Sequence, residues 1–181
     1  MAVIKLILTM LLLMLMHGNS FAYDYDPLLL RAQTTLFPKI VLLDQDISQK
    51  IEENSLKILV LYADSDVKNA ELTKKLIEDK YKKTSRNALS VNLIKYNDYN
   101  SEIATAYFLL KGSVESVNKV TSYAESNSRI TFSYDYNDFE SNALLSVIMK
   151  EKTYIYLNKE SFQKYGIKFI PLFYKIVKVV E

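Results

Sequence analysis

A chain of 181 residues is long enough for one domain with its own core, and 49% hydrophobic with 24% charged residues is typical of a globular protein. The formal net charge of +2, with both signs interspersed, disfavours binding to nucleic acid. The sequence has no Cys, and its one His is His17 in an N-terminal leader. Hydrolase chemistry of the Ser/His or Cys/His kind, disulfides and Cys or His metal sites are therefore excluded from the mature chain.

Residues 1–22 have the three parts of a secretory signal peptide. Lys5 gives a positive start, an apolar run follows, and Ser20 and Ala22 are the small residues that a cleavage site needs. A membrane anchor is the alternative, but the apolar run is shorter than the roughly 20 residues that span a bilayer. We therefore expect cleavage after Ala22, export to the periplasm, no stable membrane insertion afterwards, and a single mature domain over 23–181.

The mature chain is predicted to open with a helix. Pro27 follows acidic residues that can cap the first turn, and Pro38 predicts a kink or a break further along. The spacing of the apolar residues places one stripe on the core, formed by Leu29, Ala32, Leu36, Ile40 and Leu43.

A strand, a helix and an outer strand follow. The apolar run 56–62 is typical of a strand that is buried on both faces. Asp64 or Ser65 can cap the next helix, which carries Val67 to Tyr81 and closes with Lys82 and Lys83. The alternating residues 89–96 predict an outer strand, so the three elements form one right-handed crossover unit.

A second unit repeats the plan with a strand at 104–110, a helix from Val114 to about Asn127 and a strand at 130–134. Two more strands, 143–149 and 153–157, are joined by so few residues that they must form an antiparallel hairpin. The sequence therefore predicts an α/β fold: a three-layer α/β/α sandwich with a mostly parallel central sheet and a C-terminal antiparallel hairpin.

The last part of the chain is predicted to be helical. Asn158 can cap a short helix that ends at Gly166, and Pro171 can open a final helix. We interpret this final helix as a cover for the sheet, with an interfacial membrane helix as the alternative. Its apolar face would consist of Leu172, Phe173, Ile176, Val177 and Val180.

Three loops are the candidate binding site. In parallel α/β sheets, ligands bind beyond the carboxyl ends of the strands where the strand order reverses. If the strands at 56–62 and 104–110 are neighbours, the loops that follow the strands converge there. The candidates for ligand or partner contact are Asp64, Ser65, Lys111, Ser113, Asp135, Tyr136 and Asp138. The alternative is that Asp64, Ser65 and Ser113 are only helix caps.

Acids and aromatic residues alternate through 134–140. Such a segment can bind a cation, a sugar ring or a partner protein, and otherwise it is a turn anchored by Tyr134 and Phe139. The pair Asp138 and Glu140 also permits a glycosidase interpretation, although nothing in the sequence fixes the separation that this reaction requires.

Cofactor chemistry is disfavoured by the glycine content. The mature chain has only Gly112 and Gly166, so it contains neither the dinucleotide fingerprint nor a P-loop. We predict no cofactor and no metal, and a protein that is not an enzyme.

Residues 130–181 resemble the C-terminal half of the YfiR-like family of periplasmic proteins. Ser133 and Asp135 stand near the family's turn after a strand, and Asn158 and Gly166 match the start and end of its short helix. The apolar positions of the family's closing helix correspond to Phe173, Tyr174, Ile176 and Val177.

This resemblance implies a non-catalytic periplasmic regulator. It would bind and repress the external domain of an inner-membrane signalling protein, such as a diguanylate cyclase, and would form homodimers. Its contact surface would include the turn at 134–142 and an exposed helix face. The alternative is a periplasmic small-molecule binding protein with its site near Asp64, Lys111 and Asp135.

Overall fold

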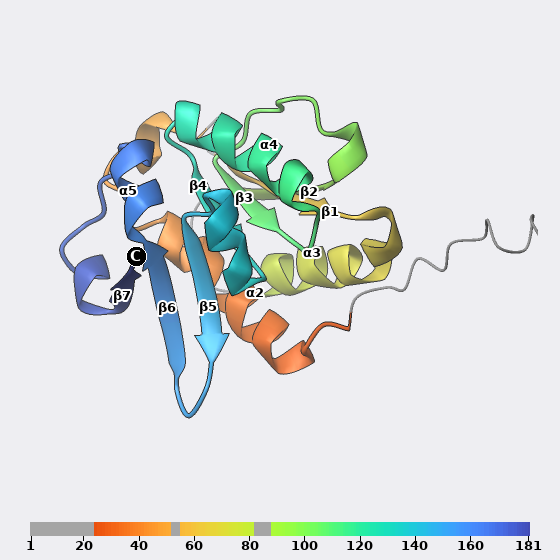
Figure 1. Ribbon diagram of the computed structural model, residues 1–181, viewed down its shortest axis with the longest axis horizontal. Coiled ribbons are helices and arrows are strands. Elements are labelled where there is room, and N and C mark those ends of the chain that lie inside the picture. Colours follow the sequence, from red (N-terminus) through yellow and green to blue (C-terminus); the bar gives the residue numbers. More distant parts are fainter. Residues whose placement is uncertain (1–23, 52–54, 82–87) are drawn as a thin grey trace, which may run out of the picture.

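The computed structural model describes residues 24–51, 55–81 and 88–181, and these residues form one seven-stranded sheet (Figure 1). The strands are β1 (Ser55–Tyr62), β2 (Ala88–Lys95), β3 (Ala106–Leu109), β4 (Ile130–Ser133), β5 (Leu145–Met149), β6 (Thr153–Asn158) and β7 (Val177–Val180). Their order is β2-β1-β3-β4-β5-β6-β7. Neighbouring strands are parallel except for the β5–β6 hairpin, which is antiparallel.

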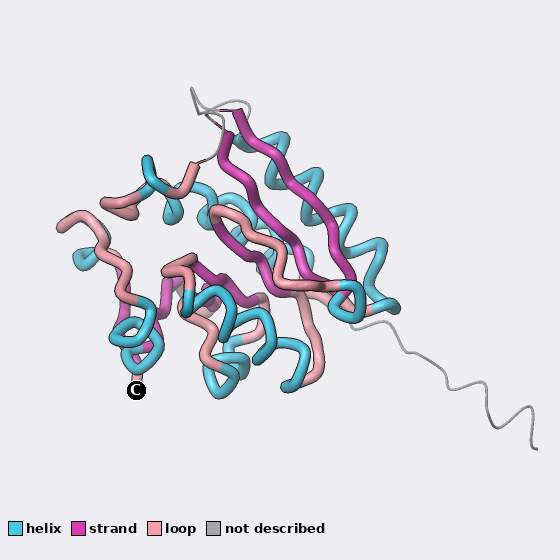
Figure 2. Tube along the Cα trace, turned by 90° about the horizontal axis from the view of Figure 1, so that it is seen from above, coloured by secondary structure: helices cyan, strands magenta, loops and turns pink. Residues whose placement is uncertain are grey.

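Helices cover both faces of this sheet, as Figure 2 shows, which confirms the predicted sandwich. The α-helices are α2 (Pro27–Val41), α3 (Val67–Tyr81), α4 (Val114–Ser126) and α5 (Lys159–Tyr165). Short 3₁₀ turns join the elements: η1 (Ile47–Gln49), η2 (Asp64–Asp66), η3 (Tyr96–Asp98), η4 (Tyr136–Ser141) and η5 (Phe173–Lys175). α2 packs beside α3, whereas α4 packs beside α5.

Aromatic rings form the contact between α2 and the sheet. Phe37 of α2 lies with its ring centroid 5.5 Å from that of Phe108 in β3 and 5.0 Å from that of Phe132 in β4. All three side chains are fully buried. On the other face, Tyr165 of α5 contacts the hydroxyl of Thr131 in β4 at 3.0 Å, so its polar end is satisfied inside the core.

The predicted helix ends agree with the structure at several points. The Asp26 carboxylate accepts hydrogen bonds from the backbone N–H groups of Leu28 and Leu29 at the start of α2. Asn158 caps α5, and Gly166 ends it at φ 64°, a conformation that glycine adopts without steric cost. The predicted break at Pro38 is wrong, because α2 continues through it to Val41.

The predicted final helix after Pro171 is also wrong. The structure has the short turn η5 followed by β7, which lies parallel to β6 at the end of the sheet. Ile176, Val177, Val179 and Val180 are β-branched and lose side-chain freedom in a helix, and the free edge of β6 offers them backbone partners. A helix of about ten residues is also marginal without strong packing.

The predicted signal peptide, residues 1–22, lies outside the residues that the structure describes. Among the described helices, none combines the length and apolar content needed to cross a membrane.

Candidate functional site

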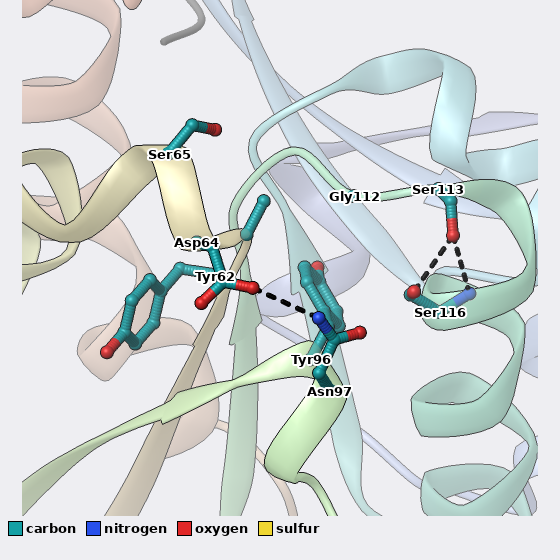
Figure 3. Close-up of a pocket in the computed structure, with 9 residues that line it drawn as sticks. Tyr62, Asp64, Ser65, Tyr96, Asn97, Gly112, Ser113 and Ser116 are labelled. Atoms are coloured by element: carbon teal, nitrogen blue, oxygen red, sulfur yellow. Dashed lines mark hydrogen bonds between the residues drawn. The ribbon is translucent and has the colours of Figure 1, made fainter. Parts of the chain in front are cut away.

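The strand order reverses between β1 and β3. β1 has β2 on one side and β3 on the other, all parallel, so their carboxyl ends meet at one edge of the sheet. The loops that leave these ends surround a hollow of ≈ 260 Å³, called here the polar hollow (Figure 3). It is lined by Tyr62, Ala63, Asp64, Ser65, Tyr96, Asn97, Gly112, Ser113 and Ser116.

One wall of the polar hollow carries a carboxylate that is paired with a lysine. The Asp64 carboxylate lies 2.7 Å from the Lys95 ammonium group and accepts a hydrogen bond of 3.0 Å from the side-chain amide of Asn97. The hydrogen bond and charge of Lys95 hold the pKa of Asp64 below its ordinary value. About half of the Asp64 side chain remains exposed, so this fixed carboxylate is accessible to a ligand.

The opposite wall is the N-terminus of α4. Ser113 caps this helix by accepting a hydrogen bond from the Ser116 N–H, and the two hydroxyl oxygens lie 2.8 Å apart (Figure 3). Whichever hydroxyl donates within this pair, the other retains a proton that can be donated to a ligand. Free N–H groups and the helix dipole make a helix N-terminus favourable for an anionic group.

Tyr96 and Gly112 form the floor. The Tyr96 ring is buried, and its hydroxyl donates to the Leu110 carbonyl oxygen at 2.6 Å. A Cβ atom at Gly112 would lie only 2.6 Å from this ring, so the residue must be glycine for the strand end and the ring to meet. The backbone at Gly112 can pack against the Tyr96 ring only because this residue has no side chain.

A buried hydrogen-bond network lies beside the polar hollow. The Tyr25 hydroxyl donates to the Asp66 carboxylate at 2.9 Å and accepts from the backbone N–H of Lys111, also at 2.9 Å. Asp66 is 2% exposed, and burial raises the pKa of Tyr25. These bonds tie the segment before α2 to the loops after β1 and β3.

Lys111 connects this network to the loop after β4. Its ammonium group lies 2.6 Å from the Asp135 carboxylate, and both side chains are largely buried. Asp138, in the same loop, accepts a short hydrogen bond from the Ser133 hydroxyl. Burial raises the pKa of Asp138 to about 6, against the lowering effect of the Ser133 bond.

The seven predicted site residues thus lie at four different places. Asp64, Ser65 and Ser113 line the polar hollow, and Lys111 pairs with Asp135 beside it. Asp138 is an internal anchor of its loop, and Tyr136 lines a different hollow. The helix-cap alternative holds for Ser113, whereas the Asp64 carboxylate binds Lys95 and Asn97 instead of capping α3.

Sequence reasoning missed Tyr25, Lys95, Asn97 and Ser116. Lys95 is the last residue of β2 and Asn97 follows that strand, whose carboxyl end lies at the same edge, so the predicted parallel sheet could have pointed to them. Ser116 lies one turn after Ser113 on the same helix face and was open to the same reasoning. Tyr25 comes from a distant segment, and nothing in the sequence signals its contact with Asp66.

Comparisons with solved structures give the fold alone. The chain is similar to a conserved domain protein from Vibrio cholerae O1 biovar El Tor, with a TM-score of 0.60 and 11% identity over 87% of this chain. It is also similar to the ABC domain from Streptococcus pneumoniae in complex with L-Trp, with a TM-score of 0.56 and 13% identity over 84% of this chain. It covers 61% and 62% of the lengths of those two chains.

No family model matches the sequence, and no curated protein matches it. The YfiR-like resemblance therefore remains a prediction.

Proposed function

We propose that this protein is an exported, non-catalytic binding module and that it binds a small zwitterion of the α-amino acid class in the polar hollow. The observation that carries the proposal is the opposite polarity of the two walls. Asp64 and the Asn97 side-chain oxygen would accept from the ammonium group, while Ser113, Ser116 and the start of α4 would donate to the carboxylate.

The size of the hollow supports the same ligand class. Its volume of ≈ 260 Å³ lies below the range of about 300–1,000 Å³ that is typical of drug-sized ligands. Its position at the reversal of strand order is where parallel α/β sheets bind ligands. The similarity in fold to a domain crystallised with L-Trp agrees with this choice.

The test is a calorimetric titration of the purified protein with each free amino acid, supported by thermal shift. A ligand at about 100 times its dissociation constant should stabilise the protein by about 2.7 kcal/mol. Asp64→Asn and Ser116→Ala should each weaken binding about tenfold, because each removes a bond to a charged ligand group.

Matched controls keep the result specific. Asp79→Asn on the exposed side of α3 and Ser122→Ala on the exposed side of α4 remove the same chemical groups away from the hollow. Both should bind the amino acid as the parent protein does. The proposal fails if no amino acid binds, or if the control variants weaken binding as much as the variants in the hollow.

A second candidate is the periplasmic regulator implied by the YfiR-like resemblance, acting on the sensor domain of an inner-membrane signalling protein, as a monomer or a homodimer. One observation favours a protein contact: the segment at the β7 edge exposes Leu172, Tyr174, Ile176 and Val179, each by about half. Exposed edge strands accept strands from other chains.

Co-purification from membranes tests this candidate. A tagged chain should recover a membrane sensor protein, and Val179→Lys at the exposed edge should abolish the recovery while leaving the fold intact by circular dichroism. Recovery of the tagged chain alone would count against the regulator.

A further inference from the structure

A second hollow, of ≈ 280 Å³, lies between η4 and the start of α5 and shares no lining residue with the polar hollow. We call it the aromatic hollow. Tyr136 and Phe139 from η4 form one part of its lining, and Asn158 and Glu160 from the β6–α5 junction form another. Asn137, Glu140 and Glu181 complete the lining.

Its wall belongs to a row of aromatic rings. The Tyr136 ring centroid lies 4.8 Å from that of Phe139 and 5.4 Å from that of Tyr156 in β6. Tyr156 in turn lies 6.3 Å from Tyr154. At that far end of the row, the Lys178 ammonium group sits 3.5 Å from the centre of the Tyr154 ring. The protein therefore already places a cation on one face of the row.

Carboxylates surround the other end of the row. Glu140, Glu160 and Glu181 line the aromatic hollow, and the nearby Lys159 is held by Glu181 at 2.5 Å. In the described part of the chain, Glu140 and Glu160 form no ion pair. The hollow thus combines an excess of acidic side chains with two aromatic side chains.

The combination of acidic and aromatic side chains suits a bulky ammonium group better than a metal ion. Across residues 24–51, 55–81 and 88–181, no group of three or more acidic side chains is close enough together to hold a metal ion. A bulky ammonium group needs no such convergence, because its charge is spread over its methyl or methylene surface and is attracted to ring faces. Separated carboxylates at the rim then add attraction at longer range.

We propose that the aromatic hollow binds an alkylated ammonium group, with Tyr136 and Phe139 as the ring faces and Glu140 and Glu160 as the charges at the rim. This site is separate from the zwitterion site at the carboxyl ends of β1 and β3. An ammonium ligand in the aromatic hollow would contact η4, which is anchored on the β4 end by the bond between Asp138 and Ser133.

The experiment is a titration of the purified protein with tetramethylammonium chloride, followed by tyrosine fluorescence and by NMR, at an ionic strength held constant with NaCl. Tetramethylammonium cannot donate strong hydrogen bonds, so it reports on ring faces and charge alone. tert-Butanol is the neutral control of similar shape. Saturable binding of the cation and none of the alcohol is the expected result.

Variants then separate the two components of the site. Tyr136→Leu keeps apolar bulk but removes the ring, and should weaken binding about 3- to 10-fold. Tyr136→Phe keeps the ring face and should bind like the parent. Glu140→Gln with Glu160→Gln should weaken binding severalfold, while Glu151→Gln in the β5–β6 turn should not.

Each contrary result overturns the proposal. These are the absence of saturable binding, equal binding of tert-butanol, a Tyr136→Leu variant that binds like the parent, or a Glu151→Gln variant that loses as much affinity as the double variant.

Discussion

The polar hollow and the aromatic hollow are built from similar parts, since strand ends and helix starts line both. In the polar hollow, the Tyr96 ring is the floor, and its hydroxyl is used internally on the Leu110 carbonyl. In the aromatic hollow, Tyr136 is only partly buried and forms part of the lining. The first therefore offers hydrogen-bonding groups of both signs, and the second offers ring faces and negative charge.

The difference follows from where each hollow lies in the sheet. The polar hollow lies where three parallel strands end together, so three loops supply polar groups to one place. The aromatic hollow lies beside the antiparallel hairpin, where β6 runs against β5 and presents a row of tyrosines on one face. The aromatic hollow is lined instead by η4, the start of α5 and Glu181, so a different set of loops supplies each site.

The largest expected effect concerns tyrosine hydroxyls. Tyr25→Phe removes a donor to buried Asp66 and an acceptor for Lys111 N–H, and should destabilise the protein by roughly 2–3 kcal/mol. Tyr136→Phe, in the aromatic hollow, should change stability by less than about 0.5 kcal/mol. Urea denaturation measures both. If the two variants lost the same amount of stability, the hydroxyl group of Tyr25 would matter no more to the fold than that of Tyr136, which would contradict this comparison.

The two glycines give the next comparison. Gly112→Ala drives a Cβ atom against the buried Tyr96 ring and should destabilise the protein by about 2 kcal/mol through overpacking. Gly166→Ala has room for the Cβ atom but a φ of 64°, so it should cost about 1 kcal/mol through backbone strain. Only Gly112→Ala should also abolish amino acid binding. If the Gly112→Ala variant were as stable as the parent protein, the Tyr96 ring would be able to move away from the added Cβ atom, and the expected overpacking would be wrong.

Asp138 lies in the loop that joins the two regions, and its effect depends on pH. Its raised pKa means that the unfolded carboxyl loses its proton near pH 4 while the folded one keeps it to about pH 6. The contribution of Asp138 to stability should therefore fall as the pH rises from 4 to 6. Asp138→Asn should remove this slope and stabilise the protein at pH 7 by about 1–2 kcal/mol.

Asp79→Asn, which changes an exposed acid of the same type, is the control for Asp138. Denaturation midpoints measured at intervals from pH 4 to pH 8 provide the comparison. A slope that survives in Asp138→Asn would assign the pH dependence to another group.

The sandwich could be predicted from the sequence because its signals are local. The apolar run of β1, the cap at Asp26 and the short β5–β6 connection each follow from residues adjacent in the chain. The prediction for the segment after Pro171 was wrong because its apolar spacing fits a helix as well as a strand. The segment forms β7 because the open edge of β6 offers it backbone hydrogen bonds.

The candidate site was predictable only in part. Parallel strands place Asp64, Ser65 and Ser113 together once β1 and β3 are neighbours. The contact of Tyr25 with Asp66 spans 41 positions and depends on how α2 enters the core. The separation of Tyr136 from the polar hollow depends on the turn geometry of η4, which the alternation of acids and aromatics does not specify.

The central claim is that the polar hollow recognises both charges of a free amino acid. An NMR titration of isotope-labelled protein with the amino acid that binds best in calorimetry tests it most directly. The account predicts saturable shifts of the backbone signals of Asp64, Gly112, Ser113 and Ser116, with those of Tyr136 and Glu160 unchanged. Shifts confined to the aromatic hollow, or none at saturating amino acid, would contradict it.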